Sequence, residues 1–299
     1  MGKDSKDIKK RIKTIQNIQK VTRSMKLMST AKLKQFIKAI ENNLLYKRQL
    51  INLIYKVYKN LKDFENEKKL FTNHRKINTI CLLAISGDKG LCGAYNIQIA
   101  KFLEKRIKEL KKQGYEIKLV LIGKKISAFT KRFLLNNVKE IIFEIENSKV
   151  EENWNTLNDL KTKFINNEFE RLELIYTRFT SSINSEIINS QLFPLNLELE
   201  NLTNEEANIN YDDELLIFEP NINLIFSNLV TAYIKNKLLN ALQNARTSET
   251  ATRVNSMTAA TENAEKLINE LILKYNKARQ SAITQEISEI ITSVESIKR

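Results

Sequence analysis

Glycine and proline, the residues that most often interrupt helices, are confined to the middle of this chain. The 299 residues include only six glycines and two prolines, and none of them falls between residues 3 and 86 or after Pro220. An interior proline costs a helix about 3 kcal/mol, and an interior glycine about 1 kcal/mol, relative to alanine. Both ends of the chain are therefore able to form long, unbroken helices.

Apolar or small residues recur three and four positions apart in both end segments, which predicts helices with a coiled-coil seam. In the first segment they are Ile15, Ile18, Thr22, Met25, Ser29, Leu33, Phe36 and Ile40, then Ile51, Ile54, Tyr58 and Leu61. In the last segment they are Met257, Thr261, Ala264, Ile268, Leu271, Tyr275, Ala278 and Ala282, then, after a change of register, Ile283, Ile287, Ile290 and Val294. Pro220 is well placed for the first turn of the second helix.

Two alternatives to a projecting coil are a compact bundle and a flexible linker within the last segment. Residues 245–264, ARTSETATRVNSMTAATENA, are nearly all small or polar, so they offer too little apolar area for a globular core. Linkers rich in serine and threonine usually contain glycine or proline, which this stretch lacks. We interpret it as a slim helix that packs closely on its partner.

The middle of the chain alternates β-rich runs with segments of helical period. The β-rich runs span residues 77–86, 116–125, 139–146, 171–181 and 184–195, and the helical segments 95–114, 126–137 and 150–167. This order predicts an α/β domain built from βαβ units around a largely parallel sheet. Residues 198–219 contain eight acids and no basic residue, which indicates a loop. We divide the chain into an N-terminal helix (1–70), an α/β domain (76–197), an acidic connecting loop (198–219) and a C-terminal helix (220–299).

A glycine-rich turn, SGDKGLCGAYN at residues 86–96, joins the first predicted strand to the next helix, where many proteins hold a phosphate. The turn does not match a phosphate-binding loop, because Gly93 is followed by alanine rather than by lysine. Gly87, Gly90 and Gly93 are spaced GxxGxxG rather than GxGxxG, and the second predicted strand ends in lysines rather than in an acid. We therefore expect these glycines to form a tight structural turn, and we expect no cofactor.

Composition excludes several classes of site. The chain has two cysteines, Cys81 and Cys92, and one histidine, His74, which are too few for a recognisable zinc site or disulfide framework. A single histidine also excludes most general-base schemes, so we expect no catalytic residue and no bound metal. The basic N-terminus lacks the apolar stretch of a secretory signal, which favours a cytosolic protein.

Charge is strongly segregated along the chain. The formal net charge is +14, and residues 1–35 hold eleven Lys or Arg against two acids, whereas no basic residue lies between Arg178 and Lys235. This pattern indicates several surfaces that face different partners. The residues alone leave two rival functions open, a nucleic-acid-binding coiled coil and a nucleotide-dependent enzyme centred on the glycine turn.

Three stretches give the chain a resemblance to a known family. Residues 8–35, IKKRIKTIQNIQKVTRSMKLMSTAKLKQ, the turn SGDKGLCGAYN and residues 263–290, NAEKLINELILKYNKARQSAITQEISEI, resemble the γ subunit of the rotary ATP synthase. The resemblance implies an antiparallel coiled coil of the two termini and a Rossmann-like domain that binds no nucleotide. It also implies a non-catalytic rotor that couples ion flow through the membrane c ring to ATP synthesis and hydrolysis, and that regulates both.

The resemblance further implies partners and contact residues. The partners are the α and β subunits of the catalytic head, the ε subunit and the c ring, without nucleic acid. The residues matching family positions that contact the β subunits are Met25, Arg253, Arg279, Gln280, Thr284 and Glu289. Ser293 and Val294 replace a Gly-Ala pair of the family, a departure whose effect the sequence leaves open. The expected location is peripheral, on the cytoplasmic face of a bacterial inner membrane.

Overall fold

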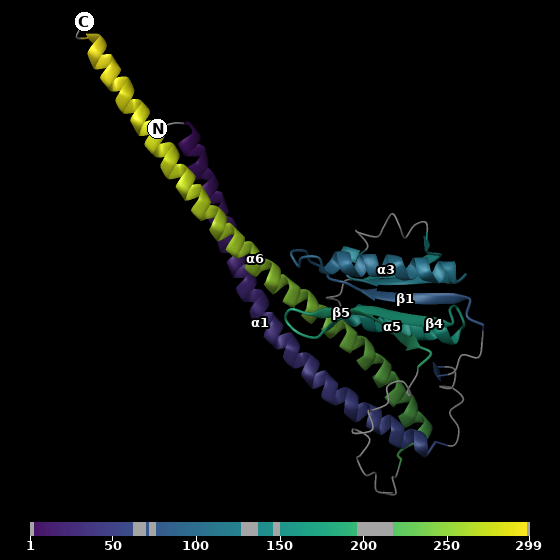
Figure 1. Cartoon of the computed structure of the whole chain (residues 1–299). Helices are drawn as coiled ribbons and strands as arrows, with labels where there is room; N and C mark the ends of the chain where they lie inside the picture. The colour runs from purple at the N-terminus through teal and green to yellow at the C-terminus, as the bar shows by residue number, and fades with distance from the viewer. Residues whose placement is uncertain are drawn as a thin grey trace. The chain divides into compact units, whose positions relative to one another are not determined.

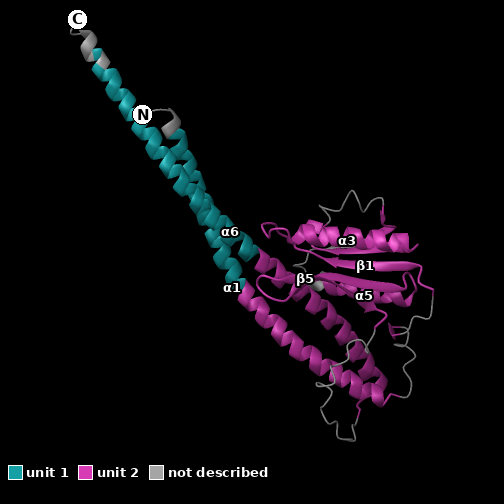
Figure 2. Cartoon of the chain, in the orientation of Figure 1, with its two compact units in different colours: residues 1–32, 253–299 teal, residues 33–252 magenta. Residues whose placement is uncertain are grey.

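The computed structural model describes residues 3–61, 70–71, 76–126, 137–145, 150–195 and 218–297. Within these ranges only the backbone is described for residues 3–5, 142–145, 150–152, 292 and 294–297. The chain forms two compact units, residues 1–32 with 253–299 and residues 33–252 (Figure 2). Two long helices, α1 (Lys3–Lys59) and α6 (Ile222–Ile297), contribute to both units.

In the first unit, α1 and α6 run antiparallel, side by side (Figure 1). Ile15 of α1 packs with Ala264, Ile268 and Leu271 of α6, and the hydroxyl oxygens of Thr22 and Thr261 lie 2.9 Å apart. The predicted antiparallel pairing of the two ends is thus confirmed, and small or branched side chains line the contact as a coiled-coil seam requires.

Three parts of the predicted seam are wrong. Tyr58 is 45% exposed, although its ring centroid lies 6.2 Å from that of Phe226. Ile18 is 51% exposed, because the buried residues Ile15, Thr22 and Ser29 repeat every seven positions and leave Ile18 on the outer side of α1. Ile283, Ile287 and Ile290 are also exposed, because this end of α6 extends past the start of α1, where no described residue of α1 lies beside it (Figure 1). The side chain of Val294, the last residue of this register, is outside the described part of the chain.

The second unit contains a sheet whose strands are β1 (Thr79–Ile85), β2 (Glu116–Ile122), β3 (Glu140–Ile145), β4 (Arg171–Phe179) and β5 (Ser185–Phe193). Among the described residues their order is β3-β2-β1-β4-β5, and only β5 pairs antiparallel to its neighbour. Each of the five predicted β-rich runs contains one of these strands. The largely parallel, Rossmann-like sheet is therefore confirmed.

Helices cover both faces of this sheet. On one face, α3 (Tyr95–Lys112) buries Ile99, Leu103 and Ile107 against β1 and β2. On the other face, α5 (Val150–Ile165) shares a core with the ends of α1 and α6 that belong to this unit. The side chains from α1 and α6 in this core include Leu50, Ile54, Phe226, Tyr233 and Leu242. The second unit is thus a three-layer arrangement in which both long helices complete one face.

Two further predictions concern segments near the second long helix. Pro220 does not form part of the first turn of α6; Asn221 instead caps the helix by accepting a hydrogen bond from the Asn223 N–H at 2.8 Å. The acidic loop lies almost wholly outside the described residues, as does most of the predicted helix at 126–137.

A buried amide pair also joins α1 to α6 in the second unit. The Asn236 side chain donates a hydrogen bond to the Asn43 carbonyl oxygen at 2.6 Å, and both residues are buried. An isolated polar pair between two helices costs stability but disfavours shifted pairings, in which it would lose its partner.

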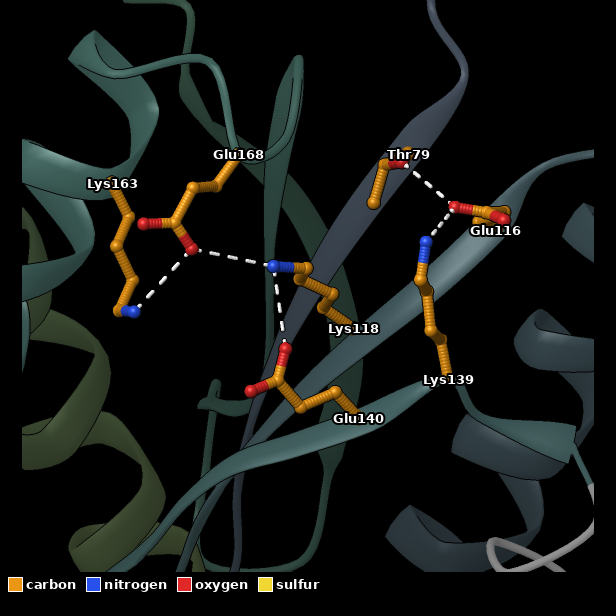
Figure 3. A network of polar contacts seen from close by, with 7 residues as sticks. All are labelled: Thr79, Glu116, Lys118, Lys139, Glu140, Lys163 and Glu168. Carbon is orange, nitrogen blue, oxygen red and sulfur yellow. Dashed lines mark hydrogen bonds and ion pairs between the residues drawn. The ribbon is translucent and has the colours of Figure 1, made fainter.

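Ion pairs tie the amino ends of the strands together (Figure 3). The Lys118 ammonium of β2 lies 3.3 Å from both Glu140 of β3 and Glu168, and Lys163 of α5 lies 3.4 Å from Glu168. Burial lowers the pKa of Lys118, but its hydrogen bonds to the two carboxylates outweigh burial and raise it overall. Lys139 pairs with Glu116 at 2.6 Å on the same edge. This edge is therefore occupied by internal ion pairs.

A buried ion pair connects α3 to β4. The Arg106 guanidinium donates to both carboxylate oxygens of Glu173, at 2.7 and 2.9 Å, and Asn189 of β5 donates at 2.7 Å. Burial alone raises the pKa of Glu173, but these hydrogen bonds outweigh it, so the pKa is lowered. The carboxylate therefore stabilises the folded domain in its ionised form.

We expect Glu173→Gln to destabilise the second unit by about 2 kcal/mol at neutral pH, because it removes charged hydrogen bonds from a buried group. Urea unfolding followed by the fluorescence of Trp154, the only tryptophan, measures the change. Since the folded pKa is depressed, the difference is complete above the unfolded glutamate pKa of about 4.3 and shrinks as pH falls through the folded pKa. Glu109→Gln, at a half-exposed partner of Arg106, is the matched control and costs less than about 1 kcal/mol. Equal effects of the two substitutions contradict the prediction.

Candidate functional site

The carboxyl edge of the sheet is where an α/β domain usually binds its ligand. Strand order reverses between β1 and β4, and ligands of open α/β sheets lie in the crevice outside the carboxyl ends at such a switch point. β1 ends at Ile85 and leads into the glycine turn, while β4 ends at Phe179. This crevice is therefore the first place to test for a nucleotide site.

Helix α6 occupies the crevice. The Asn244 side chain accepts a hydrogen bond from the Phe179 N–H at 3.1 Å, and the Ser248 hydroxyl donates to the Thr177 carbonyl at 3.4 Å. From the other side, the buried Tyr95 hydroxyl donates to the Ala245 carbonyl at 2.9 Å. The helix thus contacts the ends of both strands that flank the switch point.

Small side chains make this approach possible. Ala245, Thr247 and Ser248 are fully buried, and Thr250 and Ala251 nearly so. The prediction of a slim, closely packed helix in this segment is confirmed. The expected partner was the other long helix, whereas this half of the segment packs on the α/β domain.

The glycine turn is fitted around α6 as well. A β-carbon on Gly87 would lie 2.7 Å from the carboxyl carbon of Glu249, closer than real side chains approach. The Gly87 N–H donates to the Asn96 side chain at 3.0 Å. Gly93 has a φ of +54°, which favours glycine, whereas nothing lies within 4 Å of a β-carbon on Gly90. A carboxylate of the chain itself therefore lies over the turn, where a phosphate would need space.

Charged groups surround this contact. Burial lowers the pKa of Arg246, and the nearby Asp88 and Glu249 carboxylates oppose that shift. The Asp88 carboxylate accepts a hydrogen bond from the Lys124 N–H at 3.1 Å, which ties the turn to the end of β2. These groups hold the turn, β2 and α6 together.

Neither cysteine is placed as a nucleophile. Cys81 lies on β1 with no exposed surface, and burial raises the pKa of its thiol far above the ordinary range. Cys92 is 2% exposed and lies beside Lys89 and Asn96 of the turn. No helix in the described part of the chain is both long and apolar enough to cross a membrane.

The residues expected to contact β subunits all belong to the first unit. Met25 and Arg253 are half-buried, on α1 and α6 respectively. Arg279, Gln280, Thr284 and Glu289 are exposed on α6, past the seam around Ala264. The Thr284 hydroxyl donates to the Gln280 carbonyl at 3.0 Å, and Gln285 donates to Glu289 at 3.0 Å. They form a second group, separate in sequence and in unit from the glycine turn.

Sequence reasoning missed an apolar outer surface on the first unit. It consists of exposed side chains on both helices: Ile18, Val21, Leu27 and Met28 on α1, and Leu273, Ile283, Ile287, Ile290 and Ile291 on α6. Extended exposed apolar surface marks a contact with another protein or a membrane. The signal was present in apolar residues that exceed what one seam needs, such as Leu27 and Met28.

Known proteins resemble the whole chain. A family model described as ATP synthase matches residues 4–297. The ATP synthase gamma chain of Gloeothece citriformis is 34% identical, with 98% of this chain and 99% of the relative covered. That of Nautilia profundicola is 31% identical, with the same shares covered.

Solved structures share the fold. A chain in the central stalk and c ring of the Tetrahymena thermophila mitochondrial ATP synthase is 21% identical, with a TM-score of 0.57 over 80% of this chain and 99% of that one. A chain in the Euglena gracilis mitochondrial ATP synthase is 14% identical, with a TM-score of 0.64 over 99% of this chain and 95% of that one.

We expect Gly87→Ala to destabilise the second unit by about 1–2 kcal/mol, because the added methyl group displaces the Glu249 carboxylate. In a Glu249→Ala background the same change costs much less, so urea unfolding of the four proteins shows the double variant to be less destabilised than the sum of the two single variants. Gly90→Ala is the matched control and is close to neutral, since its β-carbon meets nothing within 4 Å. Additive effects of the Gly87 and Glu249 substitutions contradict the packing described.

Because α6 fills the crevice, the purified chain should bind neither ATP nor NAD with a Kd below about 1 mM. Isothermal titration of the full-length chain with each nucleotide measures this. Saturable micromolar binding that Gly87→Ala abolishes contradicts the occupied crevice and supports a nucleotide-dependent function.

Proposed function

This chain belongs to the ATP synthase γ chain family, and we propose that it is the rotor of the central stalk, coupling ion flow through the membrane c ring to ATP synthesis and hydrolysis. As a γ chain it is a non-catalytic subunit of the complex. Family membership rests on a match over residues 4–297 and on relatives of which this chain covers 98% or more.

The apolar outer surface of the first unit is the observation that carries the proposal. A helical pair in water keeps apolar side chains in its seam and polar ones outside. Here Val21, Leu27 and Met28 are more than half exposed, as are Leu273 and Ile287. Such side chains need a surrounding protein, and the hexamer of α and β subunits supplies one that encloses a helical shaft.

Charge on the same unit supports contact with the β subunits. Positions 1–35 hold eleven basic residues and two acids, and the ten basic side chains that the structure describes there, from Lys6 to Lys34, are exposed or partly exposed. This surface suits acidic loops on the β subunits, at contacts that Met25, Arg253, Arg279, Gln280, Thr284 and Glu289 help to form. Ser293 and Val294, which are larger than the Gly-Ala pair of the family, would lie near the C-terminal end of α6, next to the same surface.

Because the pair of α1 and α6 in the first unit is asymmetric, it can shift the conformational equilibria of three identical β subunits to different extents. Each β subunit meets another face of the coil, so each conformational equilibrium shifts by the contact energy of that face. The α/β domain then faces the ε subunit and the c ring, and in this arrangement the chain regulates hydrolysis and ion flow. The complex places it peripherally on the cytoplasmic face of a bacterial inner membrane.

The test is co-expression of the chain with the α and β subunits of the same source. We expect one copy per hexamer and hydrolysis that depends on it. Ile287→Asp, which places a charge on the apolar outer surface, should lower hydrolysis or recovery about tenfold or more without changing the helix content of the free chain. Ser281→Asp, on an exposed polar position of the same helix, is the matched control. A hexamer that forms and hydrolyses ATP equally well without the chain refutes the rotor.

A further inference from the structure

We propose that the contact between α6 and the carboxyl edge of the sheet is the joint through which torque passes between the α/β domain and the shaft. This contact, called the α6 joint below, consists of Tyr95, Thr177 and Phe179 on the domain and Asn244, Ala245 and Ser248 on α6. The inference rests on the proposed rotor function. It assigns positioning roles to residues that touch neither nucleotide nor ion.

A joint is needed to pass torque along the chain, because the two surfaces proposed to carry torque belong to different units. The α/β domain belongs to the second unit, and the outer surface that faces the β subunits belongs to the first. Helix α6 is continuous from Ile222 to Ile297 and contributes to both. Helix α1 also contributes to both units, so torque entering the domain reaches the shaft through the contacts that fix α6 and α1 to the domain. The hydrogen bonds to the sheet edge described above come from α6.

Most of the contact between α6 and the sheet is apolar. Phe226, Val230, Tyr233, Leu238 and Leu242 are buried in the core that α5 also lines. Apolar contact is favourable but non-directional, so it resists separation better than it resists sliding or turning of a helix in its groove. Hydrogen bonds, by contrast, weaken steeply when distance or angle changes.

All three hydrogen bonds of the joint have a backbone group on one side. The partners are the Phe179 N–H and the Thr177 carbonyl on β4, and the Ala245 carbonyl on α6. The Asn244 side chain is itself held, because it donates to the backbone and the side chain of Asn240 at 2.9 Å. Side-chain rotation therefore allows little movement between α6 and β4.

Close packing adds a steric stop. Glu249 lies against Gly87 so tightly that a β-carbon would overlap its carboxyl group, and Ala245 and Ser248 are fully buried. Turning α6 about its axis moves Glu249 into the glycine turn on one side and breaks the bonds to β4 on the other. The joint thus resists rotation, the motion that a loaded shaft imposes.

Weakening the joint lets α6 slip against the domain once the torque is high, without cutting the rotor at low torque. The chain still connects α1 to β1 and β5 to α6, and the apolar core remains. A variant is therefore expected to hydrolyse ATP and pump ions normally without load, and to lose pumping as the opposing ion gradient grows. A purely structural defect lowers assembly and hydrolysis together.

The test uses the complete complex in sealed vesicles, with ATP hydrolysis, assembly and the final ion gradient measured on the same samples. The variants are Asn244→Ala and Tyr95→Phe, singly and combined; Tyr115→Phe, at a half-buried tyrosine packed against the α3 core, is the matched control. We expect hydrolysis and assembly within about twofold of wild type and a clear loss of final gradient, largest in the double variant. A final gradient equal to that of wild type in the double variant overturns the proposal.

A second measurement keeps the test decisive if the double variant fails to assemble. In the free chain, Asn244→Ala should speed hydrogen exchange of the Phe179 amide about tenfold, the effect of losing one hydrogen bond, while amides of β2 stay unchanged. Unchanged exchange at Phe179 overturns the joint. A wild-type complex that neither hydrolyses nor pumps refutes the rotor function instead, so the two failures are distinguishable.

Discussion

The second unit depends on how closely α6 approaches the carboxyl edge of the sheet. Large side chains keep packed helices 8–10 Å from their neighbours, and only small ones allow a closer approach. Residues 244–251 are small or polar, and the strand ends supply hydrogen-bond partners for Asn244 and Ser248. A segment too polar for an apolar core is nevertheless buried, because backbone groups of the sheet edge satisfy Asn244 and Ser248, and carbonyls of α6 itself accept from the hydroxyls of Thr247 and Thr250. The same contact fills the crevice that other α/β domains leave for a ligand.

The two units use opposite kinds of surface. In the second unit, directional hydrogen bonds and a close fit fix α6 to its domain. On the outside of the first unit, exposed apolar side chains such as Leu27 and Ile287 offer contacts without angular preference. In the proposed rotor, the first kind suits a joint that must not turn, and the second suits a shaft that turns inside the surrounding subunits. A single chain would then separate fixed from moving contacts along α6.

Much of the fold was predictable because its signals are local. The strands are short and rich in β-branched residues, and the long helices lack glycine and proline. The seam of α6 was also predicted, since Ala264, Ile268 and Leu271 are spaced as a coil requires. Ile18 was misassigned because two apolar stripes lie side by side on α1, and spacing alone does not say which one is buried.

The candidate site was less predictable because its contacts span long distances in sequence. Glu249 lies against Gly87, and Tyr95 bonds to Ala245, although some 150 residues separate each pair. Nothing in either segment alone identifies its partner. The residues of the turn argue against a phosphate loop, but the helix that fills the crevice appeared only in the structure. The six residues proposed to contact β subunits stay a prediction that rests on family resemblance.

The buried pair of Asn43 and Asn236 has a consequence for redesign of this coil. One hydrogen bond, from the Asn236 side-chain nitrogen to the Asn43 side-chain oxygen, joins the two amides, and within the described residues the Asn43 side-chain nitrogen and the Asn236 side-chain oxygen make none. Leucines at both positions would make the helices adhere more strongly, yet they would fit almost as well one turn up or down. The helix pair would then be more stable, but its register would no longer be unique.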